Sequence, residues 1–185
     1  MAAIALHQVG FLLLFALATI ALDCGQIVRL QRNEIGRTQR HLRAMGGERS
    51  PQECPEDSNF GFPMESVVLN STKEEARLAV GFILEQIQTI FQHNFTQAEW
   101  NLTATDFFQK TLDQQQSRWK RCSTARTGEL ATSQGRRVKR TLKVYFTKLH
   151  QFLREKEHTL CAWEAVRGEI VNVYSIVISK LLGKL

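Results

Sequence analysis

The stretch from Leu160 to Ile170, LCAWEAVRGEI, decides the fold more than any other part of the chain. It places Cys161 directly before a run in which apolar residues recur at intervals of three and four. This spacing puts the apolar side chains on one face of an α-helix, which we predict to continue to about Leu182. A crosslink at Cys161 would therefore anchor a core helix at its first turn. The apolar positions of this helix are Trp163, Val166, Ile170, Val173 and Val177.

Four further helices are predicted upstream, over about residues 24–45, 73–93, 103–121 and 137–156, from the same spacing of apolar residues. The clearest is 73–93, which follows the candidate N-caps Ser71 and Thr72. No strand-like alternation and no internal repeat competes with an all-α fold. The apolar faces consist of Val28, Ile35, Leu42 and Met45; Ala76, Val80, Ile83, Ile87 and Ile90; Ala104, Phe108, Leu112 and Trp119; and Val138, Leu142, Tyr145, Phe146, Leu149, Phe152 and Leu153.

The longest connection runs from Gly46 to Ser71 and contains three prolines and the run FGFP at 60–63. Because proline interrupts helices, we expect no helix in this segment. A connection of this length can run along a bundle and join two parallel helices, whereas the short links near Asn94 and His158 favour antiparallel neighbours. The sequence therefore predicts a five-helix bundle with one long overhand loop.

The N-terminal region has the character of a secretory signal. Residues 9–22 are apolar and uncharged, and small residues such as Ala18 and Ala21 suit signal-peptidase cleavage. The run is shorter than the roughly 20 residues that span a bilayer, so we expect a signal peptide over 1–21, no membrane insertion of the mature chain, and one extracellular domain over 22–185. An uncleaved anchor is the alternative, because residues 1–8 lack the usual Lys or Arg of a signal peptide. The glycosylation sequons at Asn70, Asn94 and Asn101 agree with secretion.

Four cysteines are present, and an oxidising compartment would pair them in two disulfides. The residues themselves leave all three pairings open. These cysteines are Cys24, Cys54, Cys122 and Cys161.

The residue types required for catalysis do not occur in a productive pattern. There is no CxxC motif, His158 lacks a second metal ligand at helical spacing, and no glycine-rich loop could hold phosphate. We therefore predict no enzyme, no metal and no cofactor. The single glycines Gly36, Gly81 and Gly168 suggest close helix packing or an open contact surface.

Positive charge is concentrated between Arg118 and Lys148, where ten Lys and Arg residues face one acid, Glu129. Such a patch suits sulfated glycosaminoglycans such as heparan sulfate, while a solvated helix surface is the alternative. Secretion and the absence of a reader motif argue against nucleic acid. The candidate polyanion contacts are Arg136, Arg137, Lys139, Arg140 and Lys143.

Three stretches together carry a family resemblance: CAWEAVRGEI at 161–170, VYFTKLHQFLREKEHTL at 144–160, and FGFP at 60–63. They resemble the type I interferons, specifically the four-cysteine group of fishes, and the likeness extends over the whole mature chain. It implies a long-chain helical cytokine without catalytic activity. It also implies the disulfides Cys24–Cys122 and Cys54–Cys161.

The resemblance further implies a secreted antiviral cytokine that bridges two different class II cytokine receptor chains and activates Janus kinases and STAT proteins. One receptor chain is expected at the long loop and the last helix, and the other at the helices over 73–93, 103–121 and 137–156. Spacing places Arg167, Val171 and Ser175 on one stripe of the last helix, away from Trp163. The implied receptor-binding residues are Pro55, Asp57, Ser58, Arg167, Gly168, Val171, Asn172 and Ser175.

Two other readings compete. Another long-chain helical cytokine or hormone would share the fold and the disulfides but use different receptors. A secreted helical carrier or glycosaminoglycan-binding protein would copurify with a ligand and would not signal to cells.

Overall fold

The computed structural model describes residues 23–46, 54, 60–92, 95, 98–124 and 133–185. Within these ranges the chain is all-α and contains no strand, which confirms the predicted fold class. The expected signal peptide lies outside the described residues. The long helical segments are α2 (Cys24–Met45), α3 (Lys73–Phe91), α4 (Leu102–Thr124), α5 (Ser133–Glu155), and a last segment made of α6 (Leu160–Asn172), the π-helix η5 (Val173–Ile178) and α7 (Ser179–Gly183).

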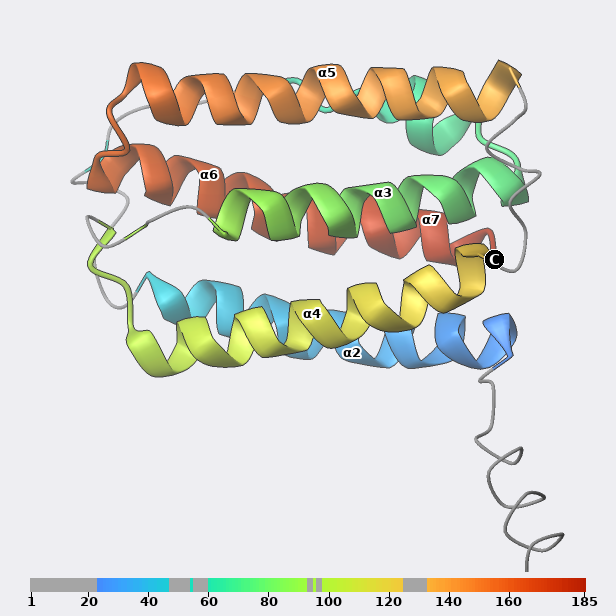
Figure 1. Cartoon of the computed structure of the whole chain (residues 1–185), viewed down its shortest axis with the longest axis horizontal. Coiled ribbons are helices and arrows are strands. Elements are labelled where there is room, and N and C mark those ends of the chain that lie inside the picture. The colour runs from blue at the N-terminus through green and yellow to red at the C-terminus, as the bar shows by residue number, and fades with distance from the viewer. Residues whose placement is uncertain (1–22, 47–53, 55–59, 93–94, 96–97, 125–132) are drawn as a thin grey trace, which may run out of the picture.

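The helices form a bundle with the predicted overhand connection. In Figure 1, α2, α3 and α5 run in one direction, while α4 and the last segment run in the other. The long connection thus joins the parallel helices α2 and α3, while the links that follow α3 and α5 join antiparallel neighbours, α3 with α4 and α5 with α6. In the same view α3 crosses in front of the last segment, α4 lies in front of α2, and α5 runs along one edge.

The predicted apolar faces form the core, because nearly all of their side chains are buried. Ile35 and Phe152 are the exceptions and are only partly buried. Thr72 caps α3 as expected, since its hydroxyl oxygen accepts the Glu75 backbone N–H at 3.2 Å. The helical periodicity of the sequence therefore identifies the core correctly.

One expectation about the long connection is wrong. A short π-helix, η2 (Glu65–Leu69), follows Pro63, and its Val67 and Val68 are buried. Proline is compatible with the start of a helix, where its missing N–H has no intrahelical partner. The expectation that prolines exclude any helix from 46–71 therefore fails just after the last of them.

The FGFP run attaches this connection to α5. Phe60 packs edge-on against Phe152, and Phe62 packs edge-on against Tyr145, with ring centroids 5.1 and 4.8 Å apart. Gly61 lies between them with a φ of 63°, a left-handed conformation that glycine adopts without strain. The glycine thus allows the two aromatic side chains to reach the same helix.

Both disulfides join segments distant in sequence. Cys24–Cys122 links the first residue of α2 to the C-terminal part of α4, and Cys54–Cys161 links the long connection to the first turn of α6. This is the pairing that the family resemblance implies.

Gly81 lets α3 and α4 approach closely. A Cβ atom at this position would lie 2.7 Å from Cδ1 of Trp119, whose side chain is only 2% exposed. The indole also donates its Nε1–H to the Arg77 carbonyl oxygen at 3.1 Å, which fixes its position. At Gly168, by contrast, a Cβ would meet no neighbouring atom within 4 Å.

We therefore expect opposite effects from two Gly→Ala substitutions. Gly81→Ala should lower the free energy of unfolding, because overpacking, typically about 1–3 kcal/mol, exceeds the gain in helix propensity. Gly168→Ala should raise it by about 0.5–1 kcal/mol. Urea unfolding of the two variants measures both values, and changes of the same sign would contradict the packing account.

Candidate functional site

The last helical segment presents an uncovered stripe on the side away from its core face. Gly168 and Asn172 are exposed, and Ile176 keeps 44% of its surface accessible. On the opposite side of the same helix, Trp163 and Ile170 are fully buried. We call Gly168, Asn172 and Ile176 the α6 stripe.

Arg167, predicted to belong to an exposed stripe, turns toward α2 instead. Its side chain is only 16% exposed. Its Nη1 donates to the Leu42 carbonyl oxygen at 2.9 Å, and its Nε donates to Glu164 Oε1 at 3.1 Å. A Cβ on Gly46 would lie 2.4 Å from Nη2, so the glycine at the end of α2 leaves room for the guanidinium. Arg167 thus binds a C-terminal carbonyl of α2, where the helix dipole favours a cation.

This geometry makes Arg167 a stabilising residue. Because a partly buried hydrogen bond to a charged group contributes about 1.5–3 kcal/mol, Arg167→Met should lower the free energy of unfolding by about that amount. Arg43→Met, at an exposed cation in the last turn of the same α2, should change it by less than about 0.5 kcal/mol. Equal unfolding midpoints for the two variants in urea would refute this role.

Val171 and Ser175 are also half-buried rather than exposed. The Ser175 hydroxyl donates to the Val171 carbonyl oxygen at 2.8 Å and accepts from Gln39 Nε2 of α2 at 2.9 Å. The π-helix η5 contains Ser175, and its wider turn shifts the register of the side chains relative to a regular α-helix. Ile176 is consequently exposed, and regular helical spacing did not identify it.

The neighbouring part of α2 extends the α6 stripe. Gln39 contacts Ser175, and Arg32 donates to the Leu182 carbonyl oxygen at 2.6 Å. Gly36 and Arg43 lie three positions before and four positions after Gln39, so they share its side of the helix. Both residues are exposed. Gly36, Arg43 and the α6 stripe together form what we call the α2–α6 face.

The structure describes only one residue next to the predicted loop contacts. Pro55, Asp57 and Ser58 lie outside the described residues. Cys54, directly before them, is bonded to Cys161 at the start of α6. The disulfide therefore anchors the chain at Cys54 to the helix that carries the α6 stripe.

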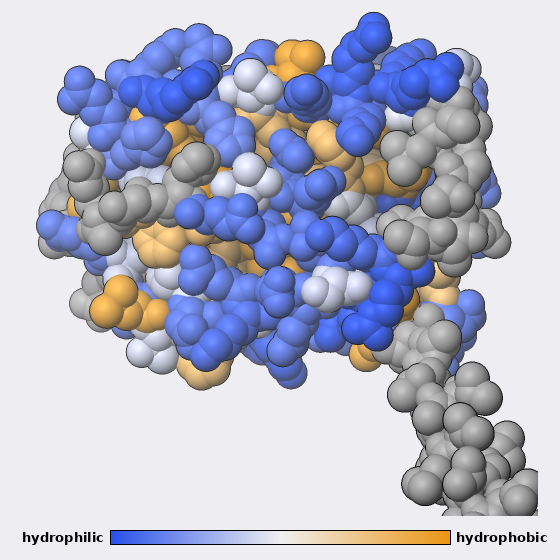
Figure 2. Space-filling view, in the orientation of Figure 1, coloured by the Kyte–Doolittle hydropathy of each residue, from blue (hydrophilic) through white to orange (hydrophobic). Residues whose placement is uncertain are grey.

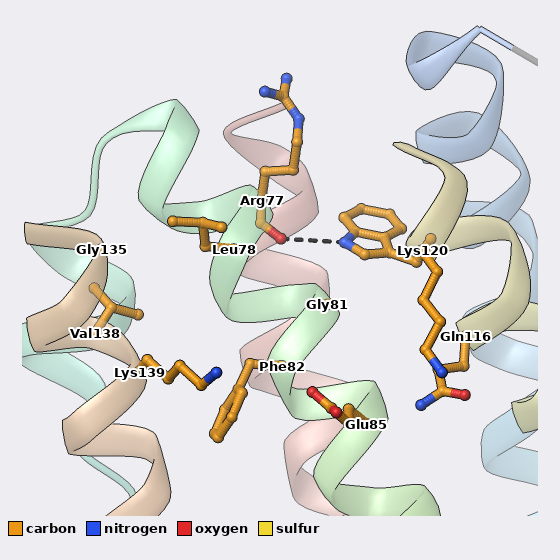
Figure 3. Close-up of a pocket in the computed structure, with 11 residues that line it drawn as sticks. Arg77, Leu78, Gly81, Phe82, Glu85, Gln116, Lys120, Gly135, Val138 and Lys139 are labelled. Carbon is orange, nitrogen blue, oxygen red and sulfur yellow. Dashed lines mark hydrogen bonds between the residues drawn. The ribbon is translucent and has the colours of Figure 1, made fainter. Parts of the chain in front are cut away.

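A second feature lies between α3, α4 and α5, on helices other than those of the α2–α6 face. Figure 3 shows this groove with α3 in the centre, α4 on one side and α5 on the other. Its volume is about 120 Å³. The Nζ of Lys139 lies 5.5 Å from the centroid of the Phe82 ring, within the range of a cation–π contact. The lining residues are Arg77, Leu78, Gly81, Phe82, Glu85, Gln116, Trp119, Lys120, Gly135, Val138 and Lys139.

The tyrosines contribute to packing between helices. The Tyr145 hydroxyl of α5 donates to Glu169 of α6 at 2.5 Å, and burial, reinforced by the Glu169 charge, raises the pKa of Tyr145 far above its ordinary value. Burial likewise raises the pKa of Tyr174, whose hydroxyl donates to Gln115 at 3.1 Å. Both phenols therefore stay protonated at neutral pH, where they link helices.

The described residues contain no cluster of three or more His, Cys, Asp and Glu side chains that could hold a metal ion. Across the same ranges, every helix is too short or too polar to cross a bilayer. The α2–α6 face and the groove between α3, α4 and α5 are two surfaces of the described residues that are open to a partner.

The remaining predicted positions lie at the surface where the structure describes them. Asn70 and Asn101 are exposed, whereas Asn94 lies outside the described residues. Oδ1 of Asn101 accepts the Ala104 N–H at 2.9 Å, which caps α4 and leaves Nδ2 available for a glycan. The candidate polyanion contacts on α5 are all exposed; they are Arg136, Arg137, Lys139, Arg140 and Lys143.

Residues 28–185 match the family model described as Interferon alpha/beta domain. The chain belongs to the interferon alpha/beta family. Interferon tau-1 of Bos taurus is 33% identical over 129 residues, which cover 68% of this chain and 66% of that protein. Interferon omega-1 of Bos taurus is 32% identical over 151 residues, covering 79% and 77%.

A solved structure supports the same assignment. Zebrafish interferon 2 has 27% sequence identity and a TM-score of 0.66, over 80% of this chain and 96% of that chain. The family is one of cytokines rather than enzymes. The resemblance carried by residues 161–170, 144–160 and 60–63 is therefore confirmed at the level of the family.

Proposed function

We propose that this chain is a secreted type I interferon that binds two different class II cytokine receptor chains, activates Janus kinases and STAT proteins, and induces an antiviral state. The observation that carries this proposal is membership of the interferon alpha/beta family over residues 28–185, on a helical bundle similar to a fish interferon. Secretion is also supported by the apolar, uncharged run at 9–22 and by two disulfides, which persist in oxidising compartments.

The α2–α6 face is proposed as the site for one receptor chain. A helix stripe with an exposed apolar residue suits a protein interface, in which a few anchors carry most of the binding energy. Here Ile176 is the apolar anchor, the absence of a side chain at Gly168 allows close approach, and Arg43 and Asn172 supply polar contacts. Arg167 contributes by holding α6 against α2 rather than by direct contact.

The groove between α3, α4 and α5 is proposed as the centre of the second receptor site. Its residues come from helices that contribute nothing to the α2–α6 face, so two receptor chains can bind at the same time. Its volume is smaller than the 300–1,000 Å³, roughly, of pockets that usually hold small ligands, so this groove suits contact with a protein. Trp119 and Phe82 provide apolar contact, and Lys120 and Lys139 provide charge.

Binding to immobilised receptor ectodomains tests both assignments. The wild-type protein should bind each of the two chains and then capture the second while bound to the first. Asn172→Glu combined with Ile176→Glu should abolish binding to one chain only. Lys120→Glu combined with Lys139→Glu should weaken binding to the other chain only.

Two results would overturn this proposal. Failure of the folded wild-type protein to bind either ectodomain would remove the receptor function. If both variants lost binding to the same receptor chain, the two faces would not bind separate receptors. Circular dichroism of each variant verifies that it is folded, so that loss of binding is not caused by unfolding.

A further inference from the structure

The outward side of α5 carries a dense row of cations. Among residues 133–155 there are seven Lys and Arg residues and a single acid, Glu155, at the last position. All seven cationic side chains are exposed. Hydrophilic residues accordingly predominate along the edge of the molecule that α5 occupies in Figures 1 and 2. The cations are Arg136, Arg137, Lys139, Arg140, Lys143, Lys148 and Arg154.

The spacing of these cations makes them neighbours in space. Arg136 lies three and four positions before Lys139 and Arg140, and Lys139 and Arg140 lie four and three positions before Lys143. Residues at these intervals are adjacent on a helix surface, and like charges there repel one another. From Arg136 to Lys148 the row extends over about 18 Å at the rise of an α-helix.

Four cations of this row have no ion pair among the described residues, unlike cations elsewhere in the fold. Arg118 is paired with Glu34, and Lys110 with Asp106. The ion pairs formed among described residues leave out Arg137, Lys139, Arg140 and Lys143. Glu65 of η2 lines an open hollow together with Arg137, but the two form no ion pair.

Most of these cations take no part in the packing of α5 against the core. The buried face of α5 is made by apolar residues such as Val138, Leu142 and Leu149. Lys139 contacts the Phe82 ring, whereas Arg140 and Lys143 are exposed to solvent. Lys139, Arg140 and Lys143 are thus neighbouring like charges without an ion pair among the described residues, and a bound polyanion would relieve their repulsion.

The chemistry around the row selects among polyanions. A helix that inserts into a membrane needs a free apolar face, but that of α5 is already buried in the core, and Val144 is its exposed large hydrophobic residue. Proteins that bind single-stranded nucleic acid present aromatic side chains for stacking, but Tyr145 and Phe146 are buried. A linear sulfated polysaccharide requires only cations in a row, and arginine binds oxyanions with two parallel hydrogen bonds.

We propose that the outward face of α5 is a binding site for sulfated glycosaminoglycans. This inference goes beyond the proposed receptor function and does not depend on it. The site is separate from the α2–α6 face, and it borders the groove between α3, α4 and α5, to which Lys139 also belongs. Binding there would retain the protein at cell surfaces and in the extracellular matrix.

Heparin affinity with charge-matched variants tests the proposal. The test variant is Arg137→Gln, Arg140→Gln and Lys143→Gln, and the control is Arg29→Gln, Arg37→Gln and Lys180→Gln, which removes the same charge at exposed positions of α2 and α7. The wild-type protein should elute from heparin at higher salt than from a sulfonate resin of matched charge density. The α5 variant should bind heparin oligosaccharides at least tenfold more weakly, and the control less than threefold more weakly.

Several outcomes would overturn the proposal. Equal losses of heparin affinity in the two variants would mean that only net charge determines binding. Elution of the wild-type protein from heparin no later than from the sulfonate resin would mean the same. Equal affinity for heparin and for vesicles containing phosphatidylserine, or for single-stranded DNA, would mean that the face does not select sulfated polysaccharide. Loss of binding to desulfated heparin would support the proposal.

Discussion

Trp163→Ala is expected to lower the free energy of unfolding by about 3–5 kcal/mol, the range for removing a fully buried aromatic side chain. Trp163 is fully buried, and its ring packs edge-on against Trp100 and Phe95 with centroids 5.5 and 6.1 Å apart. It also lies near Phe91 of α3, at a centroid distance of 6.3 Å. Truncation would leave a cavity at the end of the bundle where α3 and α6 meet the segment before α4.

Trp163→Phe is the matched control. Among the described residues, Nε1 of Trp163 has no hydrogen-bond partner although it is buried. The phenylalanine variant therefore loses packing area but also removes an unsatisfied donor, so its loss should be smaller, about 1–2 kcal/mol. Urea unfolding followed by circular dichroism measures both variants. A change below about 1 kcal/mol for Trp163→Ala would contradict a central role for this ring.

Removal of the Cys54–Cys161 disulfide, by Cys54→Ser and Cys161→Ser together, should have a similarly large effect. The bond joins residues 107 positions apart. For a loop of about 100 residues the chain-entropy model gives a stabilisation of roughly 4–5 kcal/mol, and measured values are typically about 2–4 kcal/mol. Guanidinium unfolding of the variant should show a loss in that range.

Removal of the Cys24–Cys122 disulfide is the control that separates an effect on receptor binding from an effect on stability. Its sequence separation of 98 predicts a nearly equal loss of stability. Only Cys54 directly precedes the proposed loop contacts Pro55, Asp57 and Ser58, so its variant should lose more affinity for the receptor chain that binds the α2–α6 face. The comparison is made at a temperature where both variants are folded. Equal losses of affinity would mean that this loop does not contribute to receptor binding.

The elements that the sequence predicts well are those governed by helical periodicity. The predicted helix over 24–45 agrees with α2, and that over 73–93 with α3, because single apolar stripes such as Ile83, Ile87 and Ile90 fix their faces. The short helix η2 is not predicted, because prolines interrupt helices and the long connection contains three of them. Its Val67 and Val68 were the available signal, since an apolar pair after Pro63 suits a buried turn.

The candidate site was less predictable because it depends on contacts between helices. The position of Arg167 is set by Leu42 and Gly46, which are more than one hundred residues away in sequence. The register of Ser175 and Ile176 depends on the π-helix η5, and the run IVNVYSIVI at 170–178 is apolar on several sides, so it does not fix a phase. Spacing therefore located the helix and its exposed side, but not the individual residues at the surface.

The central claim is that this member of the interferon alpha/beta family signals through receptors that contact the α2–α6 face. STAT phosphorylation in fish cells bearing type I interferon receptors tests it most directly, with wild-type protein compared with the Asn172→Glu, Ile176→Glu variant at equal folded concentration. We expect strong STAT phosphorylation with the wild-type protein. The variant should need at least a tenfold higher concentration to reach the same phosphorylation. Equal potency of the two proteins, or no response to wild type in cells that answer another type I interferon, would contradict it.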